Sequence, residues 1–336
     1  MRTAAFRCRQ PGNPFLRTSV MNTGKTRVVL SRYMVDYTKT HIPTTFGPLD
    51  GEGIPLFDPG LVRLTGAPLY HPIVIIQYGL AHHDLALDGD GEAKEVFVKC
   101  TRWLEENATE EALGRFVVWP YTFPIRTPRV RPPWISGMAQ GQALSLLARA
   151  FLKTQSARTA EVAHRAARSF CCTVRDGGVV SVSESGAYII EEVAHPSAIH
   201  ILNGFLYGLF GLYEYLKVFE DADLQPVFEK CLRGVEEILP LFDMGWWSRY
   251  SLGVRWNVAT PYYHDVHIRQ LKHLAVLLNR PQFDLYAQRW EAYGQSSSLR
   301  LRRTVLGAVE VNVNRVLTVA RLDRIKYRRV TALGVE

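Results

Sequence analysis

The strongest constraint in this sequence is a repeated order of two kinds of helical segment. Residues 137–152 are apolar on almost every face, whereas the next segment places its apolar residues, from Val162 to Cys171, on one side. A helix that is apolar all round must be buried, and a one-sided helix can cover it. The same order returns in the pair 199–216 and 224–239, in the pair 265–278 and 283–293, and in a first pair around 76–87 and 96–104.

An inner helix followed by an outer helix, about four times over, predicts a mainly α protein built as an α/α barrel, or toroid. No repeat of residue identity is visible, so the periodicity is one of structure only. The loops with the most unusual residues, 119–134, 177–196 and 242–263, each lead from an outer helix to the next inner helix. We therefore expect them to open on one end of the toroid and to carry the site.

Three parts follow from this pattern. Residues 1–70 form a lead and arm: they predict an irregular lead up to about Arg32, and then short strands and turns, rich in Pro, Gly and Asp, that wrap a larger body. Residues 71–297 form the α/α barrel, and residues 298–336 form a basic extension. The extension holds nine Lys or Arg against three Asp or Glu, so it supplies +6 of the net charge of +8. The rest of the chain is nearly neutral, and a nucleic-acid partner is not expected.

The composition, 47% hydrophobic and 21% charged, is that of a globular protein. No apolar run approaches the roughly 20 residues of a membrane span, and the N-terminus lacks an apolar signal segment. We expect a cytoplasmic protein without a membrane anchor. Phosphate-binding and dinucleotide-binding motifs are absent, so we expect no cofactor. The cysteines lack metal-ligand spacing and are expected as reduced residues in or beside the core: Cys8, Cys100, Cys171, Cys172 and Cys231.

Two adjacent glutamates, Glu191 and Glu192, stand directly before a proline and an inner helix. In an extended chain they face roughly opposite ways, so at most one need point inward; solvated loop acids are the alternative. The segment that follows the next outer helix suits sugar stacking and carboxylate binding, but it equally suits a lid on the core. Its members are Asp243, Trp246, Trp247, Arg249, Tyr250, Arg255 and Trp256.

The segment 257–271, NVATPYYHDVHIRQL, gathers tyrosines, histidines and a glutamine at the start of a helix. Helical spacing begins at Asp265, so Tyr262, Tyr263 and His264 are expected just before the helix. The free N–H groups and partial positive charge of a helix N-terminus favour an anion there. His264 and His267 share a face and could bind a metal, but no third ligand is signalled nearby, and we expect no metal site.

Five segments match a known pattern, in the same order, between about residues 70 and 290. They are YHPIVIIQYGLAHHDL, PPWISGMAQGQALSLLARAF, IIEEVAHPSAIHILNGFLYGLFGLYEY, LPLFDMGWWSRYSLG and NVATPYYHDVHIRQL. In these segments the chain resembles the D-glucuronyl C5-epimerase family, in particular its C-terminal helical domain. The animal members carry a membrane anchor and a β-rich domain between the first two segments, so this chain resembles a compact, microbial relative.

The resemblance implies a cofactor-independent polysaccharide hexuronate 5-epimerase. Such enzymes invert C5 of D-glucuronate to L-iduronate in heparosan-type polysaccharide and usually form homodimers, so the expected partners are an acidic uronic-acid polysaccharide and a second copy of the chain. By position in the motifs, Glu192 matches the catalytic glutamate, and Tyr250 and Tyr263 match two tyrosines. A base on one face of C5 and an acid on the other would invert it. A phenol, with an ordinary pKa near 10, is protonated at pH 7 and suited to donate.

Polar and aromatic residues in and between the matching segments are expected to bind the substrate. The chain departs from the family at Val193, where the family has a tyrosine, and at Gly253, where it has an arginine. Arg249 or Arg255 could take over the contact with the substrate carboxylate. The expected substrate-binding residues are Gln77, Tyr78, Trp134, Gln140, Asn203, Arg249, Arg255, His264, His267 and Gln270.

Three other functions are compatible with the same barrel. A polysaccharide lyase begins with the same proton abstraction, and a catalytically silent protein could bind an acidic glycan. A glycosidase needs two carboxylates about 5 to 9.5 Å apart, which Glu192 could form with Asp243 or Asp265.

Overall fold

The computed structural model describes residues 16–20, 26–39, 47–62, 64–125, 130–253 and 257–307. Within them, the helices pair in chain order into four hairpins, each an inner helix followed by an outer one. The hairpins are α1 (Pro72–Leu87) with α2 (Gly91–Glu106), α3 (Gly137–Thr154) with α4 (Ala157–Ala167), α5 (Leu202–Phe219) with α6 (Gln225–Ile238), and α7 (Pro261–Leu278) with α8 (Pro281–Gln295).

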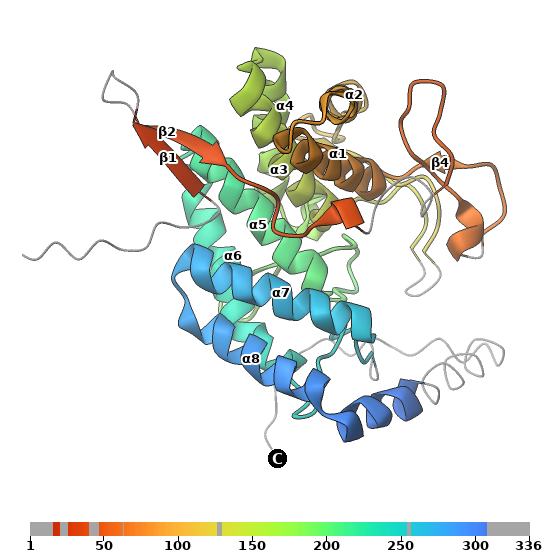
Figure 1. Ribbon diagram of the computed structural model, residues 1–336, viewed down its shortest axis with the longest axis vertical. Helices are drawn as coiled ribbons and strands as arrows, with labels where there is room; N and C mark the ends of the chain where they lie inside the picture. The colour runs from red at the N-terminus through yellow and green to blue at the C-terminus, as the bar shows by residue number, and fades with distance from the viewer. Residues whose placement is uncertain are drawn as a thin grey trace, which may run out of the picture.

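The inner helices lie side by side in chain order, with α1 packed on α3, α3 on α5 and α5 on α7. Helices α2, α4, α6 and α8 lie outside them (Figure 1). Side chains at the helix starts satisfy free N–H groups: Ser136 accepts from the Ala139 N–H of α3, and Thr260 accepts from the Tyr263 N–H of α7. The predicted mainly α toroid of four hairpins is confirmed.

Helices α3 and α5 make the closest contact of the toroid through glycine. A Cβ added at Gly211 would overlap the carbonyl oxygen of Gly141, and one added at Gly141 would lie 2.5 Å from the Cα of Gly208. Real Cβ atoms do not approach backbone atoms so closely, so these positions require glycine for packing rather than for an unusual backbone conformation. The absence of side chains lets the two backbones touch.

The N-terminal part of the chain differs from the expectation. Instead of an irregular lead, β1 (Leu16–Val20) and β2 (Thr26–Leu30) form an antiparallel hairpin with Leu16 opposite Leu30. Backbone pairing, which has no 3.6-residue signal, explains why the apolar periodicity did not predict it. The other short antiparallel pairs are β3 (Leu56–Phe57) with β4 (Leu69–Tyr70), β5 (Thr109–Glu110) with β6 (Val117–Val118), and β7 (Val180–Val182) with β8 (Tyr188–Ile190).

The arm that follows β2 packs inside the row of helices, rather than around it. Tyr33 and Tyr37 are almost fully buried. The Tyr37 hydroxyl accepts from Nε2 of Gln142 on α3 at 2.8 Å and from Nε2 of Gln77 on α1 at 3.2 Å. The Tyr33 ring meets Phe210 of α5 edge-on, with 5.5 Å between centroids. The arm therefore links three inner helices.

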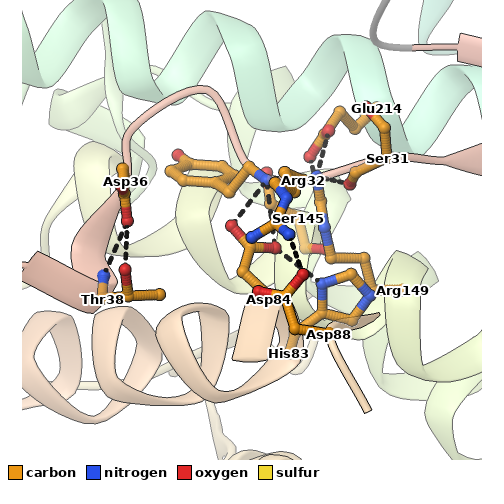
Figure 2. Close-up of polar contacts among 11 residues, drawn as sticks. Ser31, Arg32, Asp36, Thr38, His83, Asp84, Asp88, Ser145, Arg149 and Glu214 are labelled. Atoms are coloured by element: carbon orange, nitrogen blue, oxygen red, sulfur yellow. Dashed lines mark hydrogen bonds and ion pairs between the residues drawn. The ribbon is translucent and has the colours of Figure 1, made fainter. Parts of the chain in front are cut away.

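A buried charge network fixes the start of this arm (Figure 2). Arg149 of α3 donates to both carboxylate oxygens of Glu214 on α5, at 2.5 and 2.8 Å, and to the carbonyl of Ser31 at 3.2 Å. The backbone N–H of Tyr33 donates to the Asp84 carboxylate at 3.1 Å. Burial raises the pKa of Asp84 to about 6, because the charged form loses hydration. One arginine thus joins the arm to α3 and α5.

The structure also tests the expectations for membrane spans, for the cysteines and for the basic extension. No helix among the described residues is long and apolar enough to cross a membrane. Cys100 and Cys231 are buried as expected, but Cys171 is exposed and Cys172 is half-buried; Cys8 lies outside the described residues. The basic extension begins as a helix over 297–307, whose Arg303 Nε donates to the Ala259 carbonyl at 2.7 Å. The remainder, 308–336, lies outside the described residues.

Replacing Gly211 by alanine should lower the free energy of unfolding by about 2 kcal/mol or more, because the new methyl group would overlap backbone that cannot move aside. Gly294 of α8 is the matched control, since a Cβ there meets its nearest neighbour at 3.8 Å. Gly294→Ala should be neutral or up to about 1 kcal/mol stabilising. Urea unfolding followed by circular dichroism measures both; equal effects of the two substitutions would contradict the glycine contact.

Candidate active site

The three loops that link outer to inner helices meet in one apolar cluster. Val130 and Trp134 from the first loop pack with Val193 and Ile199 from the second and with Tyr250 from the third. The expected convergence at one end of the toroid is therefore observed. Val193 is only 6% exposed, so the residue that departs from the family pattern forms part of an apolar wall beside the site.

The two adjacent glutamates have different surroundings. Glu191 is fully buried and saturated: Ser181 Oγ donates to its Oε1 at 2.6 Å, and the His200 N–H donates to its Oε2 at 3.0 Å. Glu192 lies against Gly204 at the start of α5, where a Cβ would overlap its carboxylate. The amide of Asn203 donates to Glu192 Oε2 at 3.4 Å. Both oxygens of Glu191 are therefore used by the fold, whereas Glu192 accepts only one long hydrogen bond, from Asn203.

Burial raises the pKa of the Glu192 carboxyl to about 7, from an ordinary value of 4.5. The cause is desolvation, which disfavours the charged form. A carboxyl that titrates near neutral pH can both accept and return a proton under physiological conditions. Groups whose pKa values are strongly shifted by burial cluster at functional sites.

Tyr250 and Tyr263 share this environment. Their rings lie 4.7 Å apart, and their hydroxyls are hydrogen-bonded to each other. Burial, and then the negative charge of Glu192, raise the pKa of Tyr263 to about 12 and that of Tyr250 well above its ordinary value. Both phenols are therefore firmly protonated at neutral pH. Tyr250 packs with Val193, the residue next to Glu192.

Helix α7 begins earlier than expected. Pro261 occupies its first position and Thr260 caps it, so Tyr262, Tyr263 and His264 lie in the first turn rather than before it. The Thr-Pro pair, a frequent helix start, was the available signal. Tyr263 consequently points from a rigid helix, whose backbone is fixed by the cap.

His264 and His267 are buried, and their ring nitrogens lie against groups of the core. Nε2 of His264 donates to the Trp290 carbonyl at 2.9 Å, and the His264 and His267 Nδ1 atoms lie 2.7 and 3.2 Å from Ser248 Oγ. Burial lowers the pKa of His264 to about 4 and that of His267 to about 3, so both are neutral. Among the described residues, no group of three His, Cys, Asp or Glu could hold a metal.

The other predicted binding residues are distributed through the toroid. Gln77 is engaged by Tyr37, and Nε2 of Gln140 donates to the Val117 carbonyl at 3.0 Å and to Ser169 Oγ at 3.1 Å. Both therefore have partners within the fold.

Trp134 stacks on Tyr121 with 4.0 Å between centroids, and Tyr78 is buried against His82. The backbone of Arg249 pairs with Val258. Arg255 lies outside the described residues.

Asn203 and Gln270 are linked to Glu192 by hydrogen bonds, through Asn203. Nε2 of Gln270 donates to the backbone carbonyl of Asn203 at 3.1 Å. The side-chain oxygens of both residues, Oδ1 and Oε1, are buried without a hydrogen-bond partner. Because buried polar atoms are rarely left unpaired, these two acceptors, one of them on a residue that contacts Glu192, are suited to the hydroxyl groups of a sugar.

Two further tyrosines, which the sequence did not single out, belong to this environment. Burial, and then the charge of Glu192, raise the pKa of Tyr121, and burial raises the pKa of Tyr207. Tyr207 lies on α5, and a polar group on an inner helix was the available signal. The two carboxylates weighed for a glycosidase have arginine partners: Asp243 lies 2.9 Å from Arg289, and Asp265 lies 2.7 Å from Arg269.

Comparison with known proteins identifies the family. The model of the D-glucuronyl C5-epimerase C-terminus matches residues 113–292, more than half of the chain, and the match includes Glu192, Tyr250 and Tyr263. The chain belongs to this family. Within it, the chain is similar to a D-glucuronyl C5-epimerase of Caenorhabditis elegans, with 29% identity over 214 residues, which are 59% of this chain and 34% of the relative.

The chain is also similar to an uncharacterized protein of Methanocaldococcus jannaschii, with 25% identity over 53% of this chain and 57% of the relative. The chain thus spans about a third to just over half of the curated relatives it matches.

Two solved structures are more distant. An unsaturated glucuronyl hydrolase specific for heparin gives a TM-score of 0.47 at 12% identity, covering 83% of this chain and 77% of that one. A cellobiose 2-epimerase from Spirochaeta thermophila gives 0.45 at 12% identity, covering 66% and 56%. Neither likeness is close enough to establish a shared function.

The raised pKa of Glu192 predicts a pH-dependent effect of Glu192→Gln on stability. Glu192 binds its proton more tightly in the folded protein than in the unfolded chain. Its contribution to stability is therefore full below about pH 4.5 and is lost as the pH rises to about 7. Glutamine stays neutral, so the stability of the variant relative to the wild type should rise by on the order of 3 kcal/mol across this window. Urea unfolding at several pH values measures it; a difference that does not vary with pH would contradict the burial.

Proposed function

We propose that this protein inverts C5 of a hexuronate residue in an acidic, heparosan-type polysaccharide, converting D-glucuronate to L-iduronate. The observation that carries the proposal is a half-buried carboxylate, Glu192, with a pKa of about 7 beside two hydrogen-bonded, protonated phenols, Tyr250 and Tyr263. Family membership and the relative named for this reaction support it.

In the proposed reaction, ionised Glu192 takes the C5 proton, and the electron pair of the C5–H bond moves onto the adjacent carboxylate to form an enediolate. Tyr263 then gives its hydroxyl proton to the opposite face of C5. The electrons return to form the new C5–H bond, and the configuration is inverted. The reaction leaves Glu192 protonated and Tyr263 ionised, and proton exchange with water restores both groups.

Tyr250 lowers the cost of ionising Tyr263. Its hydroxyl is hydrogen-bonded to Tyr263, and a donated hydrogen bond stabilises a phenolate. Val193 itself helps to exclude water from the site and so to raise the pKa of Glu192.

The family resemblance also supports a homodimer as the active form. Light scattering of the purified protein would give the mass in solution. A mass of one chain of 38.1 kDa would contradict this part of the proposal.

Incubation with heparosan in deuterated water should place deuterium at C5, as measured by mass spectrometry. Glu192→Gln and Tyr263→Phe should each reduce the rate of exchange by about 10²- to 10⁴-fold, the usual contribution of a general base or acid. Tyr286→Phe is the matched control, because it removes a phenol hydroxyl from outer helix α8, and it should exchange at the wild-type rate.

Absence of exchange in several uronic-acid polymers would contradict the proposed reaction. An unsaturated product that absorbs ultraviolet light would indicate a lyase instead. Binding of the polymer without exchange would indicate a glycan-binding protein.

A further inference from the structure

The proposed reaction needs a cation near the carboxylate of the substrate. Removal of the C5 proton adds a second negative charge to that carboxylate, and a fixed positive charge stabilises it as it forms. Gly253, at the position where the family has an arginine, cannot supply this charge. A Cβ at Gly253 would lie 2.8 Å from the Cα of Ile199, so the position is also closed to a larger side chain.

Arg269 lies on the same inner helix as Tyr263. It follows Tyr262 by seven residues, or two turns, which puts both on one face of α7. The Tyr262 ring contacts the Tyr263 ring at a centroid distance of 5.2 Å. Burial raises the pKa of Tyr207 and of Tyr262, and the charge of Arg269 opposes both increases. The guanidinium is therefore close to phenols of α5 and α7 that adjoin the site.

The guanidinium of Arg269 has unused hydrogen-bonding capacity. One terminal nitrogen lies 2.7 Å from Asp265 Oδ2, in a pair whose side chains are 42% and 61% exposed. Its Nε is buried and has no hydrogen-bond partner. An arginine presents five donors in a planar fork that matches a carboxylate. A buried, unpaired donor costs free energy, and a ligand carboxylate that accepted from it would remove that cost.

We infer that Arg269 binds the carboxylate of the hexuronate and so replaces the cation that is missing at position 253. The inference rests on the proposed function. Two residues of α7 then act on neighbouring groups of the substrate: Tyr263 acts at C5, and Arg269 binds the carboxylate bonded to C5. Asp265, which shares the guanidinium, then competes with the substrate for it.

Binding measured by calorimetry tests the inference without requiring turnover. The probes are heparosan oligosaccharides and the same oligosaccharides with their carboxyl groups reduced to alcohols. Arg269→Gln should weaken binding of the uronate probe by about 10- to 100-fold, the usual loss for a charge-assisted pair, and should leave binding of the reduced probe unchanged. Arg269→Lys should retain part of the affinity, because lysine keeps the charge but not the fork.

Arg158→Gln is the matched control. Arg158 forms an exposed pair with Glu161 three residues along outer helix α4, so its loss should not change binding of either probe. Equal binding of the uronate probe by Arg269→Gln and the wild type would overturn the inference. So would an equal loss of affinity for the two probes.

Asp265→Asn separates a ligand-binding role from a structural one. If Arg269 served only to pair with Asp265, loss of either partner would act in the same direction. The inference instead expects Asp265→Asn to bind the uronate probe at least as tightly as the wild type, and weaker binding would overturn it. A wild-type protein that binds the uronate probe but exchanges no deuterium would refute the proposed reaction, while the comparison of Arg269 variants would still decide the binding role.

Discussion

The site depends on the close contact between α3 and α5. Glycines on both helices leave space for the segment that ends β8 and continues into Glu191 and Glu192. A Cβ at Gly137 would lie 2.7 Å from the Glu191 carbonyl oxygen, and one at Gly208 would lie 2.7 Å from the Ile190 side chain. At Gly204 it would overlap the Glu192 carboxylate itself. Missing side chains, rather than specific contacts, therefore place Glu192, the proposed base, beside α5.

Burial at this point has two useful effects. It brings the pKa of Glu192 near neutral pH, where a carboxylate is a stronger base than an ordinary glutamate, and it keeps the neighbouring phenols protonated. The same loss of hydration thus prepares an acceptor and a donor from residue types whose ordinary pKa values differ by more than five units. It also makes ionised Glu192 sensitive to any cation nearby, because charges interact more strongly away from water.

The sequence predicted those features that follow from apolar periodicity and from order along the chain. The alternation of all-round and one-sided helices predicted the four hairpins, because burial on all sides leaves no other place for a helix such as α3. The convergence of the three loops followed from the same order. The family resemblance pointed to Glu192 and Tyr263, and the structure brings them into one environment.

Other features depend on contacts that no local pattern records. Tyr33 and Tyr37 lie in a segment of mixed composition, and nothing local indicates that their partners are Gln77 and Gln142 on separate helices. The charge of Arg269 is visible in the sequence, but its unpaired Nε is not. The early start of α7 had a local signal in Thr260 and Pro261, which the apolar spacing from Asp265 onward outweighed.

The arm inside the helix row also constrains the order of folding. Its contacts join residues 105 and 118 positions apart, from Tyr37 to Gln142 and from Ser31 to Arg149, and such long-range contacts close slowly. The arm is synthesised before α3 and α5, and Glu214, which completes the ion pair of Arg149, is made later still. The arm therefore cannot reach its final contacts until both helices have been made. Tyr207, whose hydroxyl is hydrogen-bonded to Tyr37, links the arm to the surroundings of the site.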